Sequence, residues 1–130
     1  MCCTILCITH YSVITNKERL LNNDDLISSL VQELRRGTLI MVVLSQLKNE
    51  EYGYSLISKL KENGITIESN TLYPLLRRLE NQGLLKSEWK TNEEKPRKYY
   101  LITKDGLKVL EKSKGHWKEY SNAVNKILEK

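Results

Sequence analysis

The chain has 130 residues, of which 40% are hydrophobic and 28% are charged, and its formal net charge is +5. This length suits one domain with a single core, and the composition is that of a globular protein, which excludes an intrinsically disordered chain. No apolar run reaches the ~20 residues that a bilayer-spanning helix needs, so we expect no membrane partner. The positive charge is compatible with nucleic-acid binding but also occurs in ribosomal and membrane-surface proteins.

Residues 1–22 are interpreted as a poorly ordered N-terminal extension, or as the product of a start codon assigned too far upstream. Cys2, Cys3 and Cys7 form no disulfide framework and fit a reducing cytoplasm. With His10 they could ligate zinc on paper, but adjacent cysteines are awkward tetrahedral ligands and no second ligand pair follows. We therefore expect a cytoplasmic protein with no metal site and no cofactor.

The first predicted helix begins near residue 23, with acidic residues in its first turn. Apolar residues then follow the i, i+3, i+4, i+7 spacing of one helical face: Ile27, Leu30, Val31 and Leu34. The apolar pattern resumes after Gly37 and continues to Leu47. We interpret this segment as one helix with a weak point at Gly37, or as two helices that meet there.

A second helix is predicted from about residue 52 to residue 63. Its apolar residues Leu56, Ile57 and Leu60 are expected to face inward, and Gly64 stops it. The segment that follows, residues 65–67, is long enough only for a short bridging strand.

A third helix is predicted to start after Ser69 or Asn70, either of which can be its N-cap, and to end at residues 80–83, with Gly83 in the C′ position. On a helical wheel one narrow arc is apolar and forms the core side: Leu72, Leu75, Leu76 and Leu79. The opposite side and its flanks carry the remaining residues of interest: Asn70, Tyr73, Pro74, Arg77, Arg78 and Asn81. Pro74 is assigned to the first turn, where its missing N–H costs no hydrogen bond.

Two strands and a last helix complete the chain. Residues 84–90 and 97–102 have strand composition, and the polar segment 91–96 between them has the size of a hairpin tip. Trp89 on the first strand is expected to pack the hairpin onto the helices. Thr103 is expected to cap a helix that runs to the C-terminus.

This order predicts a mainly α fold with a small two-stranded β-hairpin. Because a bare hairpin is marginal alone, it must lie against the helices, which gives a winged helix-turn-helix with N- and C-terminal dimerisation helices. We expect three regions: the extension 1–22, a DNA-binding domain 23–103 with its N-terminal helix, and a dimerisation helix 104–130.

Arg77 and Arg78 of the third helix could simply form a solvated face, balanced in part by Glu80. We favour contact with DNA, because this face combines small polar residues with arginines, which suit phosphate contact and guanine recognition. A basic hairpin tip follows the helix closely enough to touch the adjacent backbone: Lys95, Pro96, Arg97 and Lys98.

Several motifs, taken in order, resemble the PadR family of bacterial transcriptional regulators. They are Tyr52-Gly53-Tyr54, Thr71 to Glu80, Gly83-Leu84-Leu85, Pro96 to Tyr100 and Leu101 to Gly106. The resemblance implies a homodimer that binds a near-palindromic operator, usually represses, and is often released by a phenolic or drug-like molecule. It implies DNA contacts at Thr71, Tyr73, Arg77, Arg78, Lys95, Arg97 and Lys98, to which we add Asn70. The acidic Glu93-Glu94 replaces the family's glycine-rich wing, so the helix contacts are better supported than the tip.

A 3-4-3-4-3 spacing marks a heptad seam in the last helix: Leu110, Ser113, Trp117, Tyr120, Val124 and Ile127. The short tail resembles the branch of the family in which a single C-terminal helix makes the dimer. We expect this seam to pack on the first helix of a second subunit, through Ile27, Leu30, Leu34, Leu110, Trp117, Val124 and Ile127.

An aromatic residue at the position of Trp117 lines a drug cavity in some short-tailed relatives. Trp117 could therefore stack on a flat ligand, with Tyr120 and Ser113 beside it. Alternatively, Trp117 fills the dimer core.

No phosphate loop, H-E-x-x-H or G-x-S-x-G motif is present, and we expect no enzymatic activity. The rival hypothesis is a winged-helix protein-interaction module whose arginine face meets an acidic protein. The salt dependence of DNA binding would discriminate between these two hypotheses.

Overall fold

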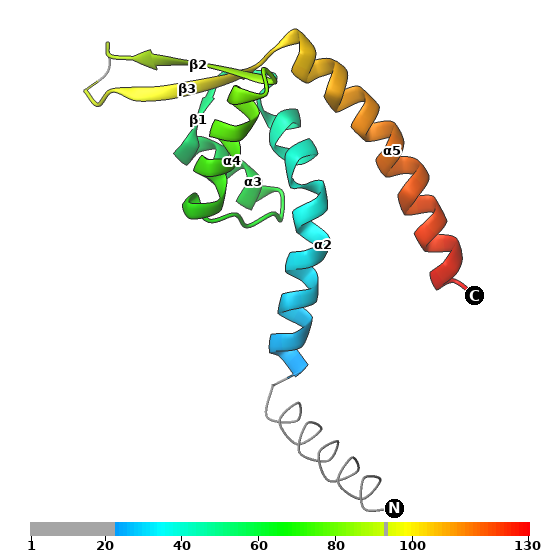
Figure 1. The fold of residues 1–130 in the computed structure, drawn as a ribbon. Helices are drawn as coiled ribbons and strands as arrows, with labels where there is room; N and C mark the ends of the chain where they lie inside the picture. The colour runs from blue at the N-terminus through cyan, green and yellow to red at the C-terminus, as the bar shows by residue number, and fades with distance from the viewer. Residues whose placement is uncertain (1–22, 93) are drawn as a thin grey trace, which may run out of the picture. The chain divides into compact units, whose positions relative to one another are not determined.

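The computed structural model describes residues 23–92 and 94–130 (Figure 1). The predicted extension 1–22 and the zinc alternative at its cysteines lie outside the described residues. The elements follow in the order α2 (Asn23–Gln46), β1 (Glu51–Tyr52), α3 (Gly53–Glu62), α4 (Ser69–Asn81), β2 (Leu85–Lys90), β3 (Arg97–Ile102) and α5 (Lys104–Leu128). Contacts group the chain into two units, residues 1–38 and residues 39–130. The domain boundaries expected from the sequence stay a prediction.

Within the first unit, the described residues belong to α2. The helix continues through Gly37 without a break, so the alternative of two helices that meet there is wrong. Large apolar side chains of this part of α2 are exposed: Leu26, Ile27, Leu30 and Leu34. An apolar face of this kind needs a covering surface.

The second unit is built around one hydrophobic core. The end of α2, α3, α4, the sheet and the start of α5 all contribute side chains to it: Val43, Leu44, Leu47, Leu56, Leu60, Ile67, Leu72, Leu75, Leu76, Leu79, Leu85, Tyr100, Ile102 and Leu110. The four leucines predicted for the core side of α4 are all buried, which confirms the assignment of that face. The other side of α4 is therefore held in a fixed direction.

The sheet has three antiparallel strands in the order β1-β3-β2, not the predicted two. The additional strand is β1, in which Glu51 pairs with Tyr100 and Tyr52 with Tyr99. Residues 65–67, predicted as a bridging strand, form none. Instead, the Ile65 amide bonds to the carbonyl of Leu60 and closes the end of α3.

The start of α4 differs from the prediction, and its end confirms it. Its N-cap is Glu68, whose carbonyl accepts the amides of Thr71 and Leu72, and neither Ser69 nor Asn70 has this role. At the other end Gly83 has a φ of 79°, and the Leu84 amide reaches back to the carbonyl of Leu79. This is a Schellman motif, for which glycine is the preferred residue.

Pro74 lies in the second turn of α4, not in the predicted first turn. It therefore lacks the N–H that would bond the carbonyl of Asn70, four residues earlier. Because Asn70 is exposed, water can satisfy this carbonyl.

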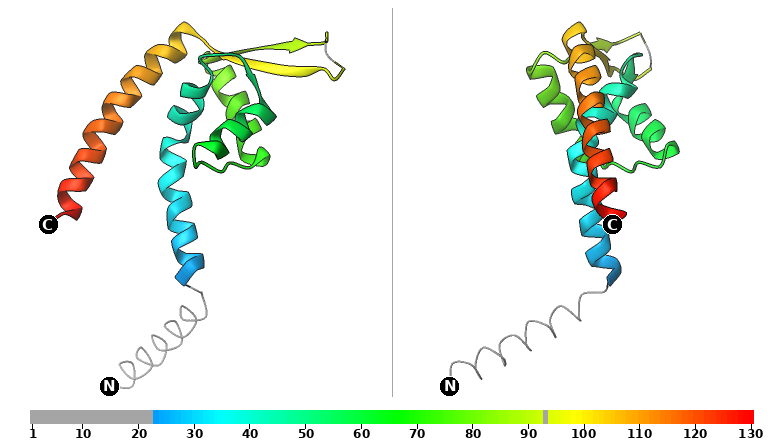
Figure 2. Two further views of the ribbon diagram at one scale, coloured as in Figure 1. Left: turned by 180° about the vertical axis from the view of Figure 1, so that it is seen from behind. Right: turned by 90° about the vertical axis from the view of Figure 1, so that its right-hand side faces the viewer.

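The β2–β3 hairpin and α5 form as predicted. The outer part of the hairpin extends beyond α3 and α4 (Figure 1; Figure 2, left). The Thr103 hydroxyl accepts the Gly106 amide and caps α5. This mainly helical body with its small sheet confirms the winged-helix fold class. Within residues 23–92 and 94–130, no helix is both long and apolar enough to span a membrane.

Candidate nucleic-acid interface

The outer face of α4 presents the residues that the sequence predicts to contact DNA. Asn70, Thr71, Arg77 and Arg78 are all exposed, whereas the leucines between them are buried. The same helix thus anchors itself in the core and displays two guanidinium groups. Such groups can bind phosphate or the O6 and N7 atoms of guanine.

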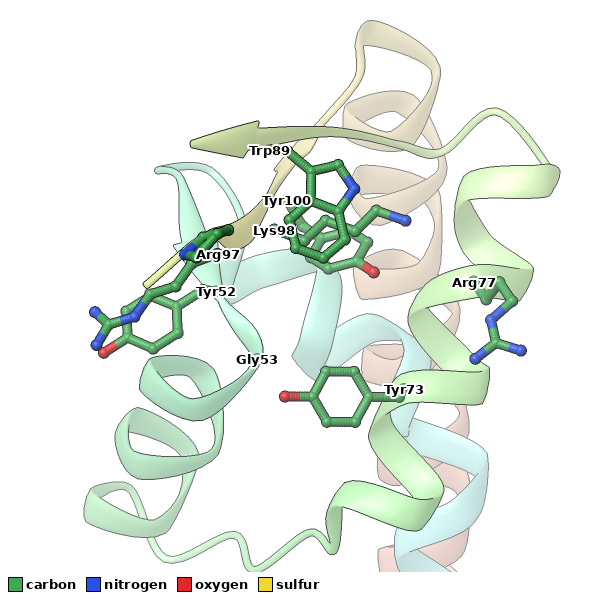
Figure 3. Close-up of a pocket in the computed structure, with 9 residues that line it drawn as sticks. Tyr52, Gly53, Tyr73, Arg77, Trp89, Arg97, Lys98 and Tyr100 are labelled. Carbon is green, nitrogen blue, oxygen red and sulfur yellow. The ribbon is translucent and has the colours of Figure 1, made fainter. Parts of the chain in front are cut away.

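Tyr73 lies on the flank of α4, and its ring is seated on the backbone of α3. A Cβ atom placed on Gly53 would lie 2.4 Å from the Tyr73 hydroxyl oxygen, so a side chain there would displace the ring. Figure 3 shows Tyr73 pointing from α4 toward Gly53. Gly53 thus helps to orient a predicted DNA-contacting residue, a role that only the three-dimensional contact reveals.

The inner face of the hairpin is directed toward the helices. Trp89 pairs with Lys98, and both lie on the same face as buried Leu85 and Ile102. The expectation that Trp89 packs the hairpin onto the body is nevertheless wrong, since 61% of its surface is exposed. Trp89 does lie on the face of β2 that is directed toward the helices. It is close to the outer end of the strand, however, and the hydrophobic core does not extend that far.

The hairpin cations contact aromatic rings of the sheet. The Arg97 guanidinium lies 4.4 Å from the centre of the Tyr52 ring, and the Lys98 ammonium lies 5.5 Å from that of Tyr100. Such stacking limits the directions in which these cations can point while leaving their charge available. Lys95, at the tip, is exposed.

Glu80 links α4 to both strands of the hairpin. Its Oε1 accepts a hydrogen bond of 2.9 Å from the Ser87 hydroxyl of β2. Its Oε2 lies 3.9 Å from the Lys98 ammonium of β3, and among the described residues this buried oxygen has no hydrogen-bond partner. These contacts set the position of the hairpin relative to α4. The sequence indicates for Glu80 only a charge that balances the arginines, because its partners lie on other elements.

A cavity of about 370 Å³ lies between α4, the start of α3 and the hairpin (Figure 3). Its lining combines aromatic and cationic side chains: Tyr52, Gly53, Tyr73, Arg77, Trp89, Pro96, Arg97, Lys98 and Tyr100. Of the residues predicted to contact DNA, the structure brings Tyr73, Arg77, Arg97 and Lys98 together here. Asn70, Thr71, Arg78 and Lys95 do not line it. The surface as a whole can bind an extended anion that has both apolar and charged parts.

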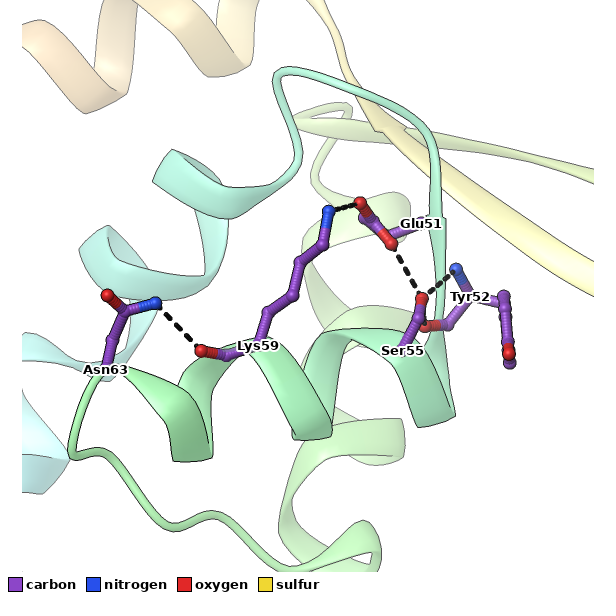
Figure 4. Close-up of polar contacts among 5 residues, drawn as sticks. All are labelled: Glu51, Tyr52, Ser55, Lys59 and Asn63. Carbon is purple, nitrogen blue, oxygen red and sulfur yellow. Dashed lines mark hydrogen bonds and ion pairs between the residues drawn. The ribbon is translucent and has the colours of Figure 1, made fainter.

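A buried carboxylate supports the start of α3 behind this surface. Glu51 accepts hydrogen bonds from Ser55, at 2.7 Å, and from Lys59 (Figure 4). Burial alone would raise the pKa of Glu51, but these hydrogen bonds and the charge of Lys59 outweigh it and hold that pKa below its ordinary value. At neutral pH the carboxylate is therefore ionised and joins β1 to α3.

The residues predicted to bind a small molecule lie on α5. Trp117 and Tyr120 are exposed, and the Ser113 hydroxyl donates to the carbonyl of Val109 at 2.7 Å. None of them lines the cavity beside α4. Their ligand role stays a prediction.

The seam residues of α5 separate into two groups. Leu110 is fully buried in the core of its own chain, so its assignment to the dimer seam is wrong. The spacing could not show this, because α5 starts against the body, where Gly106 touches Leu84. Trp117 and Ile127 are exposed, and Val124 is half-buried. These three residues remain available to a partner.

Comparisons with known proteins agree on one family. The family described as "Transcriptional regulator PadR-like family" matches residues 40–112. A transcriptional regulator of Mycobacterium tuberculosis (strain ATCC 25618 / H37Rv), Rv3488, is 30% identical over 95 residues, which cover 72% of this chain and 89% of that protein.

Solved structures are similar over most of their length. A PadR family transcriptional regulator from Eggerthella lenta DSM 2243 is 57% identical with a TM-score of 0.78, and the match covers 82% of this chain and 95% of that one. A PadR-like transcription factor from Bacteroides fragilis is 38% identical with a TM-score of 0.64, covering 76% and 98%.

Proposed function

The chain belongs to the PadR-like family of transcriptional regulators, and we propose that it is a homodimeric repressor that reads a near-palindromic operator. One observation carries this proposal. The leucines of α4 are locked in the core while Arg77 and Arg78 on its other side are exposed next to a cationic hairpin. In this arrangement α4 enters the major groove, and the hairpin contacts the neighbouring backbone.

Exposed apolar side chains on two helices support the homodimer. Ile27, Leu30 and Leu34 of α2 are 58%, 65% and 74% exposed, and Ile127 of α5 is 69% exposed. We propose that the α5 seam of one subunit covers the α2 face of the other. A two-fold dimer presents two copies of α4 to successive major grooves, which accounts for a near-palindromic site.

Repression, release by an effector and residence in the cytoplasm complete the proposal. Repression is the mode that the family resemblance implies, and the cysteine usage fits a reducing compartment. A flat phenolic or drug-like molecule would stack on Trp117 between the subunits. Such a compound should quench the fluorescence of a Trp89→Phe protein, in which Trp117 is the remaining tryptophan.

Regulation of transcription requires no catalysis, and the expectation that the chain is not an enzyme stays a prediction.

Selection of bound fragments from the parent genome, followed by titration over a range of salt concentrations, tests the proposal. A dimer that makes at least about six phosphate contacts should show a slope of log K against log [salt] of about −5 or steeper. The selected duplex should bind far more tightly than a scrambled one at 0.15 M salt. If no duplex binds better than random DNA, the protein-interaction hypothesis replaces this proposal.

A further inference from the structure

Trp89 lines the cavity between α4 and the hairpin. DNA contacts at α4 and at the hairpin tip do not explain why this side chain is exposed. Trp89 has 61% of its surface exposed, although it lies on the strand face that is directed toward the helices. Tryptophan is usually well buried, and tryptophan side chains are enriched at binding interfaces. Trp89 lines this cavity together with Tyr73 and Arg77 of α4.

We propose that this cavity seats a sugar–phosphate segment of one strand of double-stranded DNA, with Trp89 packed against a deoxyribose. The inference rests on the proposed function and adds a contact residue, Trp89, to it. The contact is independent of base sequence, because every nucleotide presents the same sugar face.

The chemistry of the lining favours this occupant. A DNA strand alternates anionic phosphates with the apolar faces of its sugars. The cavity matches this alternation, because its lining combines the cations Arg97 and Lys98 with aromatic surface from Trp89 and Tyr73. Arg97 and Lys98 belong to β3 and Tyr73 belongs to α4, so an occupant that contacts all three spans from the hairpin to the helix. A strand whose bases face α4 has this shape.

Contacts within the protein also hold the side chains that line the cavity in position in the absence of DNA. Tyr73 is seated on Gly53, Lys98 lies between the Tyr100 ring and Glu80, and Ser87 bonds to Glu80. Trp89 is two residues beyond Ser87 on the same face of β2, so the Ser87–Glu80 bond fixes its approach to α4. A preformed seat of this kind loses little conformational freedom on binding.

Three variants test whether the cavity binds a sugar–phosphate segment. Each is titrated with the operator and with a scrambled duplex over a series of salt concentrations. Trp89→Ala should weaken binding by about tenfold on both duplexes, because the buried sugar contact is lost irrespective of sequence. Its salt slope should be unchanged, since no phosphate charge is released. Lys98→Ala should instead reduce the slope by about one. Trp89→Phe should recover most of the affinity, since it restores an apolar ring.

A fluorescence measurement separates this inference from the proposed function. Duplex binding is followed by the anisotropy of labelled DNA, and tryptophan emission is recorded in the same titration. The wild-type protein should show a DNA-induced change in emission that Trp89→Phe lacks. DNA binding without that difference, or an unchanged affinity in Trp89→Ala, would contradict the proposed contact of Trp89 with DNA. Neither result would contradict the proposed function as a DNA-binding regulator. Failure of every duplex to bind overturns both.

Discussion

Gly106 and Gly115 both lie in α5, but their surroundings differ. A Cβ on Gly106 would lie 2.2 Å from the backbone oxygen of Leu84 and 2.6 Å from the Ile102 side chain. Among the described residues, no atom outside its two neighbours and the backbone of the surrounding helix lies within 4 Å of a Cβ on Gly115. Gly106 therefore permits the close approach of α5 to the body, whereas Gly115 only lowers the helix propensity of α5.

Alanine at these two positions should change stability in opposite directions. Gly106→Ala forces a backbone shift and should lower the free energy of unfolding by about 1–3 kcal/mol. Gly115→Ala should raise it by about 0.5–1 kcal/mol, because alanine is the better helix former. Urea denaturation of both variants measures the difference. Equal effects at the two sites would contradict the close contact of Gly106 with Leu84.

Periodic sequence patterns correctly predicted the helices and their buried faces. Apolar spacing identified α4 and its buried face, and Gly83 and Thr103 marked helix ends that the structure confirms. The two-residue strand β1 was missed because it has no period to detect and forms through backbone pairing with β3. Short strands of this kind depend on a neighbour that is distant in the sequence.

The candidate interface was predicted only in part, because several of its contacts join elements that are distant in the sequence. Alternation along β2 shows which face Trp89 occupies, but not how far the hairpin extends past the helices. In α5 the spacing that marks a seam also includes Leu110, which the body buries. The contacts of Glu80 and Gly53 join different elements, and no local pattern encodes them.

The join between β1 and α3 should weaken in acid. Glu51 has a pKa below its ordinary value of 4.5 in the folded protein, so the stability it contributes is present above that value. That stability is lost as the pH falls through the lower folded-state pKa. Glu51→Gln should lower the free energy of unfolding by about 1–2 kcal/mol at pH 7, where charged hydrogen bonds are lost. The gap between the variant and the wild type should narrow as the pH falls below 4.5.

An exposed ion pair next to this site supplies the control. Glu50 accepts a hydrogen bond of 2.5 Å from Lys90, which raises the pKa of Lys90, and both side chains are about 40% exposed. Glu50→Gln should leave stability nearly unchanged, because water screens this exposed pair. Chemical denaturation at several pH values compares the two variants. A Glu51→Gln protein as stable as wild type at pH 7 would contradict the role of the buried pair.

The proposed dimer accounts for the exposed apolar faces of α2 and α5. Leu34→Asp places a charge on the α2 face and should convert dimers to monomers in sedimentation equilibrium, with a parallel loss of DNA affinity. Gln32→Asp on the opposite side of α2 is the matched control and should leave the dimer intact. A Leu34→Asp protein that remains dimeric would place the interface elsewhere.

If α4 reads DNA bases, the loss of the Arg77 guanidinium should affect one base pair more than the others. Affinities of the wild type and Arg77→Ala are measured by anisotropy on the selected operator, its single-base variants and a scrambled duplex, with Lys112→Ala of α5 as a charge-matched control. Arg77→Ala should weaken operator binding by about 1–3 kcal/mol and relax the preference at one base pair. An equal loss on every duplex, or none beyond that of the control, would contradict base reading by Arg77.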